Sequence, residues 1–177
     1  RGNLLSERTV GVLGCGHAGK DLCQLLRSFG CRVLAHDIRD FSDFYTTHGI
    51  VAVNLETLLM NSDIVSVHLP LNPSTRGMLG AENLAGMREG AILINTARGG
   101  IVDEIALKVM LKDDRMAAAA FDVFAVEPPE DEELLGLPNF LATPHIGGSA
   151  EEAIIAMGRA AIEGLDTYGD PNEVAVG

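Results

Sequence analysis

The sequence predicts an α/β fold built on a doubly wound parallel sheet. Short β-branched runs alternate along the chain with segments that have helical periodicity, which is typical of parallel strands joined by crossover helices. Several of these runs are apolar at successive positions, as strands buried on both faces are. The chain has 177 residues, of which 47 % are hydrophobic, and this is enough for one domain with its own core.

Four strands are expected in the first half, the third of them short and weak: residues 9–13, 31–35, 50–53 and 63–67. After the first strand, five apolar residues recur at helical spacing: Ala18, Leu22, Leu25, Leu26 and Phe29. Gly30 suits the position that ends this helix, because glycine adopts a left-handed backbone at little cost. Asn54 can cap a short helix that ends at Leu59.

Three further strands are expected in the second half: residues 91–94, 116–121 and 140–142. Asp103 can cap a helix that ends at Leu111. Ser149 and Glu152 have the spacing of a capping box, which opens a final helix. That helix should turn five apolar residues inward: Ile154, Ile155, Ala161, Ile162 and Leu165.

Composition narrows the class of protein. Lys and Arg number 13 and Asp and Glu 25, for a net charge of −12, which argues against a nucleic-acid surface. No apolar run reaches about 18 residues, so no membrane span is expected. The cysteines are odd in number and lack metal-type spacing (Cys15, Cys23 and Cys31), which favours reduced thiols, a cytoplasmic location and no metal. The chain begins with Arg1 and no signal peptide precedes the first strand, so we expect it to start inside a longer protein.

A glycine motif, Gly14-Cys-Gly16-His-Ala-Gly19, lies between the first strand and its helix. In this context the first glycine permits the turn, the second lets the backbone approach a pyrophosphate, and the third lets the helix pack closely. Asp37 follows 23 residues after Gly14, at the end of the second strand. Its carboxylate would accept hydrogen bonds from ribose hydroxyls and repel a 2′-phosphate, which favours NAD over NADP, although Arg39 could bind that phosphate. The motif therefore predicts a Rossmann-type dinucleotide-binding domain; the alternative is a plain glycine turn with a solvated Asp37.

Three groups suited to chemistry follow later strands: Arg98, Glu127 and His145. An arginine can hold a carboxylate through two parallel hydrogen bonds. A histidine can move a proton near neutral pH, and a carboxylate beside it favours the protonated ring. Taken singly, the first two could be surface ion-pair residues and the third a packed histidine. Together in one dinucleotide fold, they are the groups needed to reduce a 2-keto acid.

The chain resembles the NAD-binding domain of the D-isomer-specific 2-hydroxyacid dehydrogenases over about residues 4–170. The resemblance is carried by five segments: Gly14–Gly19, His68–Thr75, Asn95–Glu104, Asp122–Pro129 and Pro144–Ser149. It implies hydride transfer between NAD(H) and a D-2-hydroxy or 2-keto acid, with Arg98 binding the substrate carboxylate, His145 as acid and base, and Glu127 as its partner. It also implies these cofactor contacts: Gly14, Gly16, His17, Ala18, Gly19, Asp37, Leu69, Pro70, Thr75, Thr96, Ala97, Arg98, Asp122, His145, Gly147 and Gly148. Asp122 would face the nicotinamide carboxamide, and residues 69–87 are more similar to the 3-phosphoglycerate dehydrogenases than to the formate enzymes.

The same resemblance implies a domain organisation. Residues 1–177 would be the nucleotide-binding domain of a larger two-domain subunit, with residues 1–8 as the incoming hinge and residues 149–177 as the C-terminal helix and outgoing hinge. The N-terminal substrate domain would be absent, so the isolated chain is expected to bind NAD without turning over substrate. A homodimer through this domain is implied, with a small 2-hydroxy or 2-keto acid as substrate and neither nucleic acid nor membrane as partner.

Two other functions remain open at this stage. A dinucleotide-sensing corepressor or other binding module on the same fold could keep Arg98, Glu127 and His145. A different Rossmann enzyme, such as one like alanine dehydrogenase, is disfavoured by the spacing of the segments that carry these residues. Turnover by the full-length protein distinguishes an enzyme from a binding module.

Overall fold

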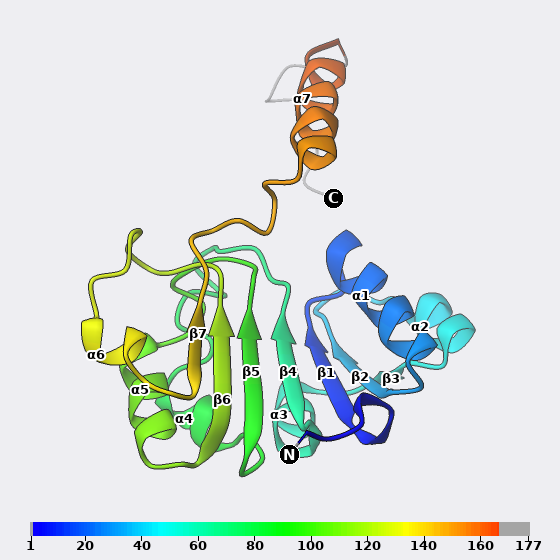
Figure 1. Ribbon diagram of the computed structural model, residues 1–177. Coiled ribbons are helices and arrows are strands. Elements are labelled where there is room, and N and C mark those ends of the chain that lie inside the picture. The colour runs from blue at the N-terminus through cyan, green and yellow to red at the C-terminus, as the bar shows by residue number, and fades with distance from the viewer. Residues whose placement is uncertain (1, 167–177) are drawn as a thin grey trace. The chain divides into compact units, whose positions relative to one another are not determined.

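The computed structural model describes the backbone of residues 2–166 and the side chains of residues 2–164 (Figure 1). The chain divides into two compact units, Arg1–Pro144 and His145–Gly177. A short 3₁₀ helix, η1 (Leu5–Glu7), precedes the first strand. None of the helices in the described part of the chain is long and apolar enough to cross a membrane.

The first unit is built on an all-parallel, seven-stranded sheet of order β3-β2-β1-β4-β5-β6-β7. In chain order the strands are β1 (Thr9–Leu13), β2 (Arg32–His36), β3 (Val51–Ala52), β4 (Ile64–Val67), β5 (Ala91–Asn95), β6 (Met116–Phe121) and β7 (Phe140–Ala142). The predicted doubly wound, Rossmann-type fold is confirmed. The strand order reverses between β1 and β4, so the crevice for a ligand lies at the carboxyl ends of these two strands.

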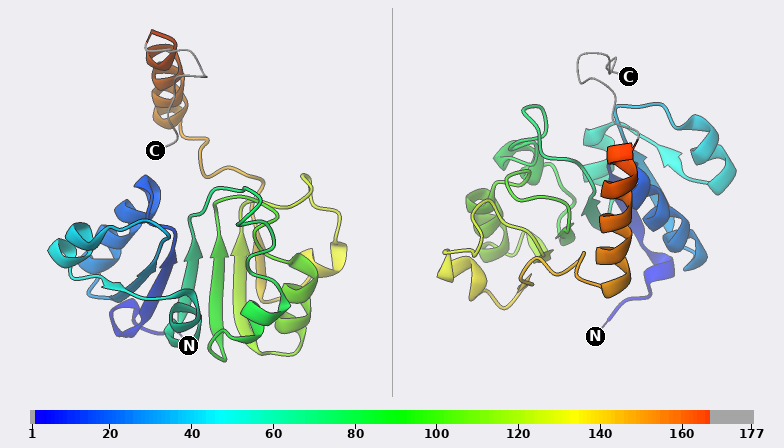
Figure 2. Two further views of the ribbon diagram at one scale, coloured as in Figure 1. Left: turned by 180° about the vertical axis from the view of Figure 1, so that it is seen from behind. Right: turned by 90° about the horizontal axis from the view of Figure 1, so that it is seen from above.

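Helices cover the sheet on both faces. They are α1 (His17–Ser28), α2 (Ser42–His48), α3 (Leu55–Asn61), α4 (Ala81–Ala85), α5 (Glu104–Lys112) and α6 (Glu132–Leu135). Figures 1 and 2 show α1 and α2 on one face, beside β1 to β3, and α3, α4 and α5 on the opposite face. Two apolar cores result, because Val10 and Val12 of β1 pack towards α1 while Leu13 packs with α3.

Local signals for the helix ends are confirmed. Gly30 has a left-handed φ of 80° and follows α1. The Asn54 side chain accepts a hydrogen bond from Thr57 N–H at 2.8 Å and caps α3. Asp103 accepts from Ile105 N–H and Ala106 N–H, both at 3.0 Å, and caps α5.

The second unit contains α7 (Glu151–Asp166). The predicted capping box is wrong by one position: the first bond of the helix runs from Ile154 N–H to the Ala150 carbonyl, so Ala150 precedes the helix. The reason is a turn, closed by a bond from Ser149 N–H to the Ile146 carbonyl, that ends before the helix begins.

The inward face predicted for α7 is also wrong within the described residues. Ile154, Ile155 and Ile162 are 55 %, 48 % and 64 % exposed, and Ala161 is exposed as well. The side chain of Leu165 lies outside the described residues. Helical periodicity predicts a face that packs, but the described part of this unit contains no second element on which the face could pack.

Candidate functional site

The three motif glycines have different neighbours. Gly14 has a φ of 97°, and a Cβ there would lie 2.7 Å from the carbonyl oxygen of His68. A Cβ at Gly19 would overlap the carbonyl of Gly14, because α1 packs directly on the loop. A Cβ at Gly16 would meet no protein atom within 4 Å. Protein packing therefore requires glycine at the first and third positions, whereas the second is open space in which a ligand can approach the backbone.

The start of α1 is suited to an anion. His17 and Ala18 are its first residues and are exposed. The N–H groups of a first helical turn have no acceptor within the helix, and they carry the positive end of the helix dipole. No acidic residue lies in this turn. A diphosphate beside Gly16 would therefore meet free donors and a favourable field.

Asp37 presents a fixed carboxylate at the carboxyl end of β2. Its Oδ2 accepts a hydrogen bond from Cys15 N–H at 2.7 Å and its Oδ1 accepts one from Arg39 N–H at 2.9 Å. Each carboxylate oxygen has room for a further donor, so two ribose hydroxyls could still bind. Because the backbone fixes both oxygens, the negative charge cannot move away from a 2′-phosphate.

A pocket of about 210 Å³ lies among the glycine loop, the end of β2 and the loop after β4. Six predicted cofactor residues line it: Gly14, Gly16, Asp37, Leu69, Pro70 and Thr75. Thr75 is buried, and its hydroxyl donates to the Pro70 carbonyl at 2.6 Å and accepts from Asn72 N–H at 2.9 Å. Thr75 thus shapes the pocket wall by closing the loop.

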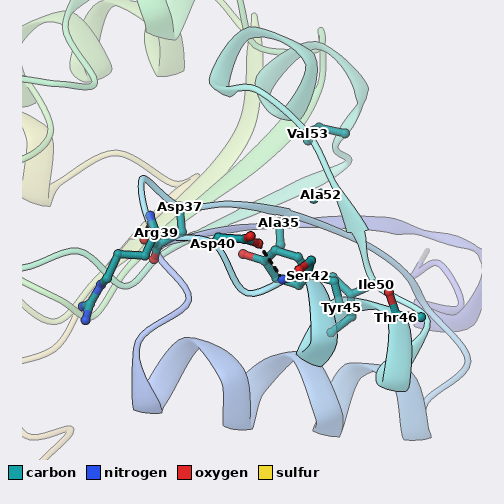
Figure 3. Close-up of a pocket in the computed structure, with 10 residues that line it drawn as sticks. All are labelled: Ala35, Asp37, Arg39, Asp40, Ser42, Tyr45, Thr46, Ile50, Ala52 and Val53. Carbon is teal, nitrogen blue, oxygen red and sulfur yellow. Dashed lines mark hydrogen bonds between the residues drawn. The ribbon is translucent and has the colours of Figure 1, made fainter.

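A second cavity, of about 330 Å³, adjoins Asp37 beside α2 (Figure 3). Asp37 and Arg39 line both spaces. The Arg39 side chain extends away from Asp40 and Ser42, and its guanidinium carbon lies 5.7 Å from the Phe41 ring centre. Asp40 instead accepts from Ser42 N–H at 2.8 Å. Arg39 is therefore an exposed cation next to the Asp37 carboxylate, and it forms no salt bridge with any carboxylate among residues 2–164.

The loop after β5 displays Arg98. Buried Asn95 shapes this loop, since its side chain accepts from Ala97 N–H at 3.1 Å and donates to the Arg98 carbonyl at 3.0 Å. Arg98 is exposed, and its Nη1 donates to the Ala97 carbonyl at 2.6 Å. None of the described carboxylates forms a salt bridge with Arg98. Its guanidinium is thus presented at the carboxyl edge of the sheet, where Thr96 and Ala97 also lie.

The next loop carries Asp122 and Glu127. Asp122 is 6 % exposed and its Oδ1 accepts from the Thr143 hydroxyl at 2.5 Å. Glu127 is exposed, and its Oε1 accepts from Phe124 N–H at 3.0 Å. A Cβ at Gly99 would overlap the carbonyl of Phe124. The structure therefore brings the loop of Arg98 into direct contact with the loop of Glu127.

The remaining predicted residues, His145, Gly147 and Gly148, belong to the second unit and are exposed. His145 has a φ of 54°, in the left-handed region that non-glycine residues seldom occupy. Such residues are concentrated at functional sites.

Two residues of the site, His68 and Thr143, were not predicted from the sequence. His68 lines the dinucleotide pocket and is hydrogen-bonded to the Ser66 hydroxyl at 2.8 Å. Burial lowers the pKa of His68, which favours the neutral ring. Thr143, directly after β7, donates a hydrogen bond to Asp122, directly after β6. No periodic pattern in the sequence predicts that these two residues pair. Among the described residues, no three His, Cys, Asp or Glu side chains are grouped as metal ligands are.

Comparisons with known proteins agree with this geometry. Residues 1–147 match the family described as D-isomer specific 2-hydroxyacid dehydrogenase, NAD binding domain. A glycerate dehydrogenase of Methylorubrum extorquens is 40 % identical over 175 residues, which are 96 % of this chain and 53 % of the relative. A crystal structure of a glyoxylate reductase from Paecilomyes thermophila has a TM-score of 0.88, with 31 % identity over 99 % of this chain and 53 % of that one. A D-lactate dehydrogenase with NAD+ from Lactobacillus jensenii has a TM-score of 0.82, with 30 % identity over 91 % of this chain and 52 % of that one. The chain spans about half the length of these relatives.

Proposed function

Because this chain belongs to the D-isomer-specific 2-hydroxyacid dehydrogenase family and is its NAD-binding domain, we propose that the whole protein transfers hydride between NAD(H) and a D-2-hydroxy acid or its 2-keto acid. One observation carries the proposal: the dinucleotide pocket and the exposed guanidinium of Arg98 lie at the same carboxyl edge of the sheet. A cofactor and a carboxylate anchor are thereby available on one side of the domain.

The cofactor, NAD, fits the residues present. The open space at Gly16 and the first turn of α1 would hold the diphosphate, and Asp37 would hold the adenosine ribose. The main chain of His17 and Ala18 would supply donors to the diphosphate. Leu69, Pro70 and Thr75 would form the opposite wall. Thr96, Ala97 and Asp122, at the ends of β5 and β6, would serve the nicotinamide half, together with Gly147 and Gly148.

Three side chains would act on the substrate. Arg98 would bind the substrate carboxylate through two parallel hydrogen bonds and so orient the neighbouring keto carbon. His145 would donate a proton to the keto oxygen as the alcohol forms, and Glu127 would stabilise the protonated ring beforehand. Bound NADH supplies the hydride. In the reverse direction, neutral His145 would accept the hydroxyl proton.

The organisation of the whole protein is also a proposal. Residues 1–177 would be one domain of a two-domain subunit, joined by hinges at residues 1–8 and 149–177 to a substrate domain at its N-terminal side. The incomplete coverage of the relatives supports this, since the match covers 53 % of the glycerate dehydrogenase. We further propose a homodimer and a cytoplasmic location. The chemistry needed at the site favours small 2-keto acids, and glycerate and glyoxylate in the names of the relatives support that class.

No observation favours the corepressor alternative: the relatives above are dehydrogenases and a reductase. The test is to assay full-length protein with NADH against glyoxylate, hydroxypyruvate, pyruvate and 3-phosphohydroxypyruvate. Oxidation of NADH with at least one of them is expected. Tight NADH binding without turnover of any of the four would refute the enzymatic proposal and favour a binding module.

A further inference from the structure

The segment at residues 122–129, which carries Glu127, is held in the core only at its start, where Val123 and Phe124 are buried and the Phe124 ring lies beside the rings of Phe121 and Phe140. A cavity of about 180 Å³ is lined by this segment, by Glu104 and by residues of α6. Val126 is 59 % exposed. Beyond Phe124, residues 125–128 are exposed, so core packing does not hold this part of the segment and its polar contacts contribute to fixing the backbone.

Glu104 supplies one of those contacts from outside the segment. It is the first residue of α5 and its Oε1 accepts a hydrogen bond from Ala125 N–H at 2.8 Å. The preceding amide, Phe124 N–H, donates to Glu127 Oε1 at 3.0 Å. Two successive N–H groups thus bind two carboxylates, one of which belongs to the rigid helix and the other to the proposed site.

The loop of Arg98 depends on the same stretch of backbone. Gly99 lies so close to the Phe124 carbonyl that a Cβ would overlap it. A shift of residues 124–125 would therefore displace the loop that presents Arg98 as well as the turn that presents Glu127. The hydrogen bond between Glu104 and Ala125 N–H therefore lies next to the contact between these two loops.

We propose that Glu104 is a positioning residue for Glu127 and Arg98, acting through its hydrogen bond to Ala125 N–H. The role rests on the proposed function, because it assumes that these two residues act on substrate. Glu104 itself lies below the segment and is not expected to touch substrate or cofactor.

A purely structural role for Glu104 predicts something different. A carboxylate in a first helical turn stabilises the helix through the dipole, whatever its side chain contacts. Glu132 provides the matched control: it is the first residue of α6, follows the cap Asp131 as Glu104 follows the cap Asp103, and is exposed. Its side chain forms no hydrogen bond with residues 122–129.

The test compares Glu104→Met, Glu104→Asp, Glu104→Gln and Glu132→Met in the full-length protein. Met removes the acceptor at similar length, Asp keeps the charge but shortens the reach, and Gln keeps an acceptor oxygen at the original reach. We expect Met and Asp to lower kcat about tenfold, the scale of a lost hydrogen bond to a charged group. KM for the keto acid should rise as well, because the loop of Arg98 is displaced, whereas Kd for NADH should change less than about twofold. Gln should recover most of kcat, and Glu132→Met should match the unmutated protein.

Amide hydrogen exchange gives a readout that needs no turnover. The Ala125 amide should exchange faster in Glu104→Met and Glu104→Asp than in Glu104→Gln, even if the unmutated protein reduces none of the keto acids. That pattern would support the Glu104 contact while the enzymatic proposal failed. Unchanged kcat in Glu104→Asp, or an equal loss in Glu104→Gln and Glu104→Met, would overturn the positioning role.

Discussion

Cofactor selectivity should depend on the carboxylate of Asp37. Replacing Asp37 by Ser removes a negatively charged carboxylate. Its two oxygens accept hydrogen bonds from Cys15 N–H at 2.7 Å and Arg39 N–H at 2.9 Å. Loss of charge-assisted hydrogen bonds to the ribose costs about 1–3 kcal/mol, so NAD affinity should fall about 5- to 150-fold. Like charges about 4 Å apart repel by about 4 kcal/mol at an effective dielectric constant of 20. Since Asp37 is partly exposed, we expect a gain for NADP on the order of tenfold, assisted by Arg39.

An isosteric variant separates the charge of Asp37 from its shape. Asp37→Asn keeps the shape, but an amide has one acceptor oxygen, whereas two backbone N–H groups point at the two carboxylate oxygens. The amide NH₂ must therefore face one of these donors, and the glycine loop should be disturbed. We expect Asp37→Asn to bind NAD no better than Asp37→Ser does.

The assay is NADH and NADPH fluorescence titration of each variant at fixed ionic strength. Asp40→Asn is the matched control, because Asp40 accepts a hydrogen bond from Ser42 N–H at 2.8 Å and lines the adjoining cavity but not the dinucleotide pocket. Its ratio of NADH to NADPH affinity should equal that of the unmutated protein. Equal affinity of the unmutated protein for the two cofactors, or unchanged NADH binding in Asp37→Asn, would refute the assignment.

Further outcomes are expected for four variants and for the isolated chain. Gly16→Ala should leave the melting temperature unchanged, because its Cβ meets no protein atom within 4 Å, yet weaken NADH binding in a titration by at least about tenfold. Arg98→Lys should lower kcat/KM for a keto acid on the order of a hundredfold in steady-state assays, since a point charge cannot make two parallel bonds. Glu127→Gln should lower kcat for keto-acid reduction in steady-state assays, because the proposed acid would lose its carboxylate partner; an unchanged kcat would remove Glu127 from its role, while His145→Ala should abolish most turnover and spare NADH binding. The isolated chain of residues 1–177 should bind NADH but show negligible turnover, because the surface that excludes water from the substrate would be missing; robust turnover would disprove the two-domain proposal.

The sequence was most informative where the determinants are local. The turn between β1 and α1 needs glycine at Gly14 for its backbone angle and at Gly19 for helix packing, and both needs appear in the spacing of the motif. The capping side chains of Asn54 and Asp103 also accept hydrogen bonds from backbone N–H groups only three residues further along the chain. These features could be predicted because the interacting atoms are neighbours along the chain.

Prediction was weaker where the partner is distant in sequence. The apolar face of α7 was predicted to be buried, but periodicity does not identify what a helix packs against. The contacts of Glu104 with Ala125 and of Thr143 with Asp122 join residues 21 positions apart in both cases. Nothing in their spacing distinguishes such pairs from ordinary polar residues, so only the folded chain reveals them.

The glycines separate the needs of the fold from the needs of a ligand. A side chain at Gly11, Gly14 or Gly99 would meet atoms of the protein itself, so folding alone accounts for each of them. Gly16 is different, since its φ of −65° suits any residue and no neighbour would obstruct a Cβ. A glycine that the protein does not require, placed at the start of a helix without acidic residues in its first turn, is explained by close approach of a ligand anion to the backbone. Gly16 is therefore the position where a substitution should impair dinucleotide binding while leaving the stability of the domain unaltered.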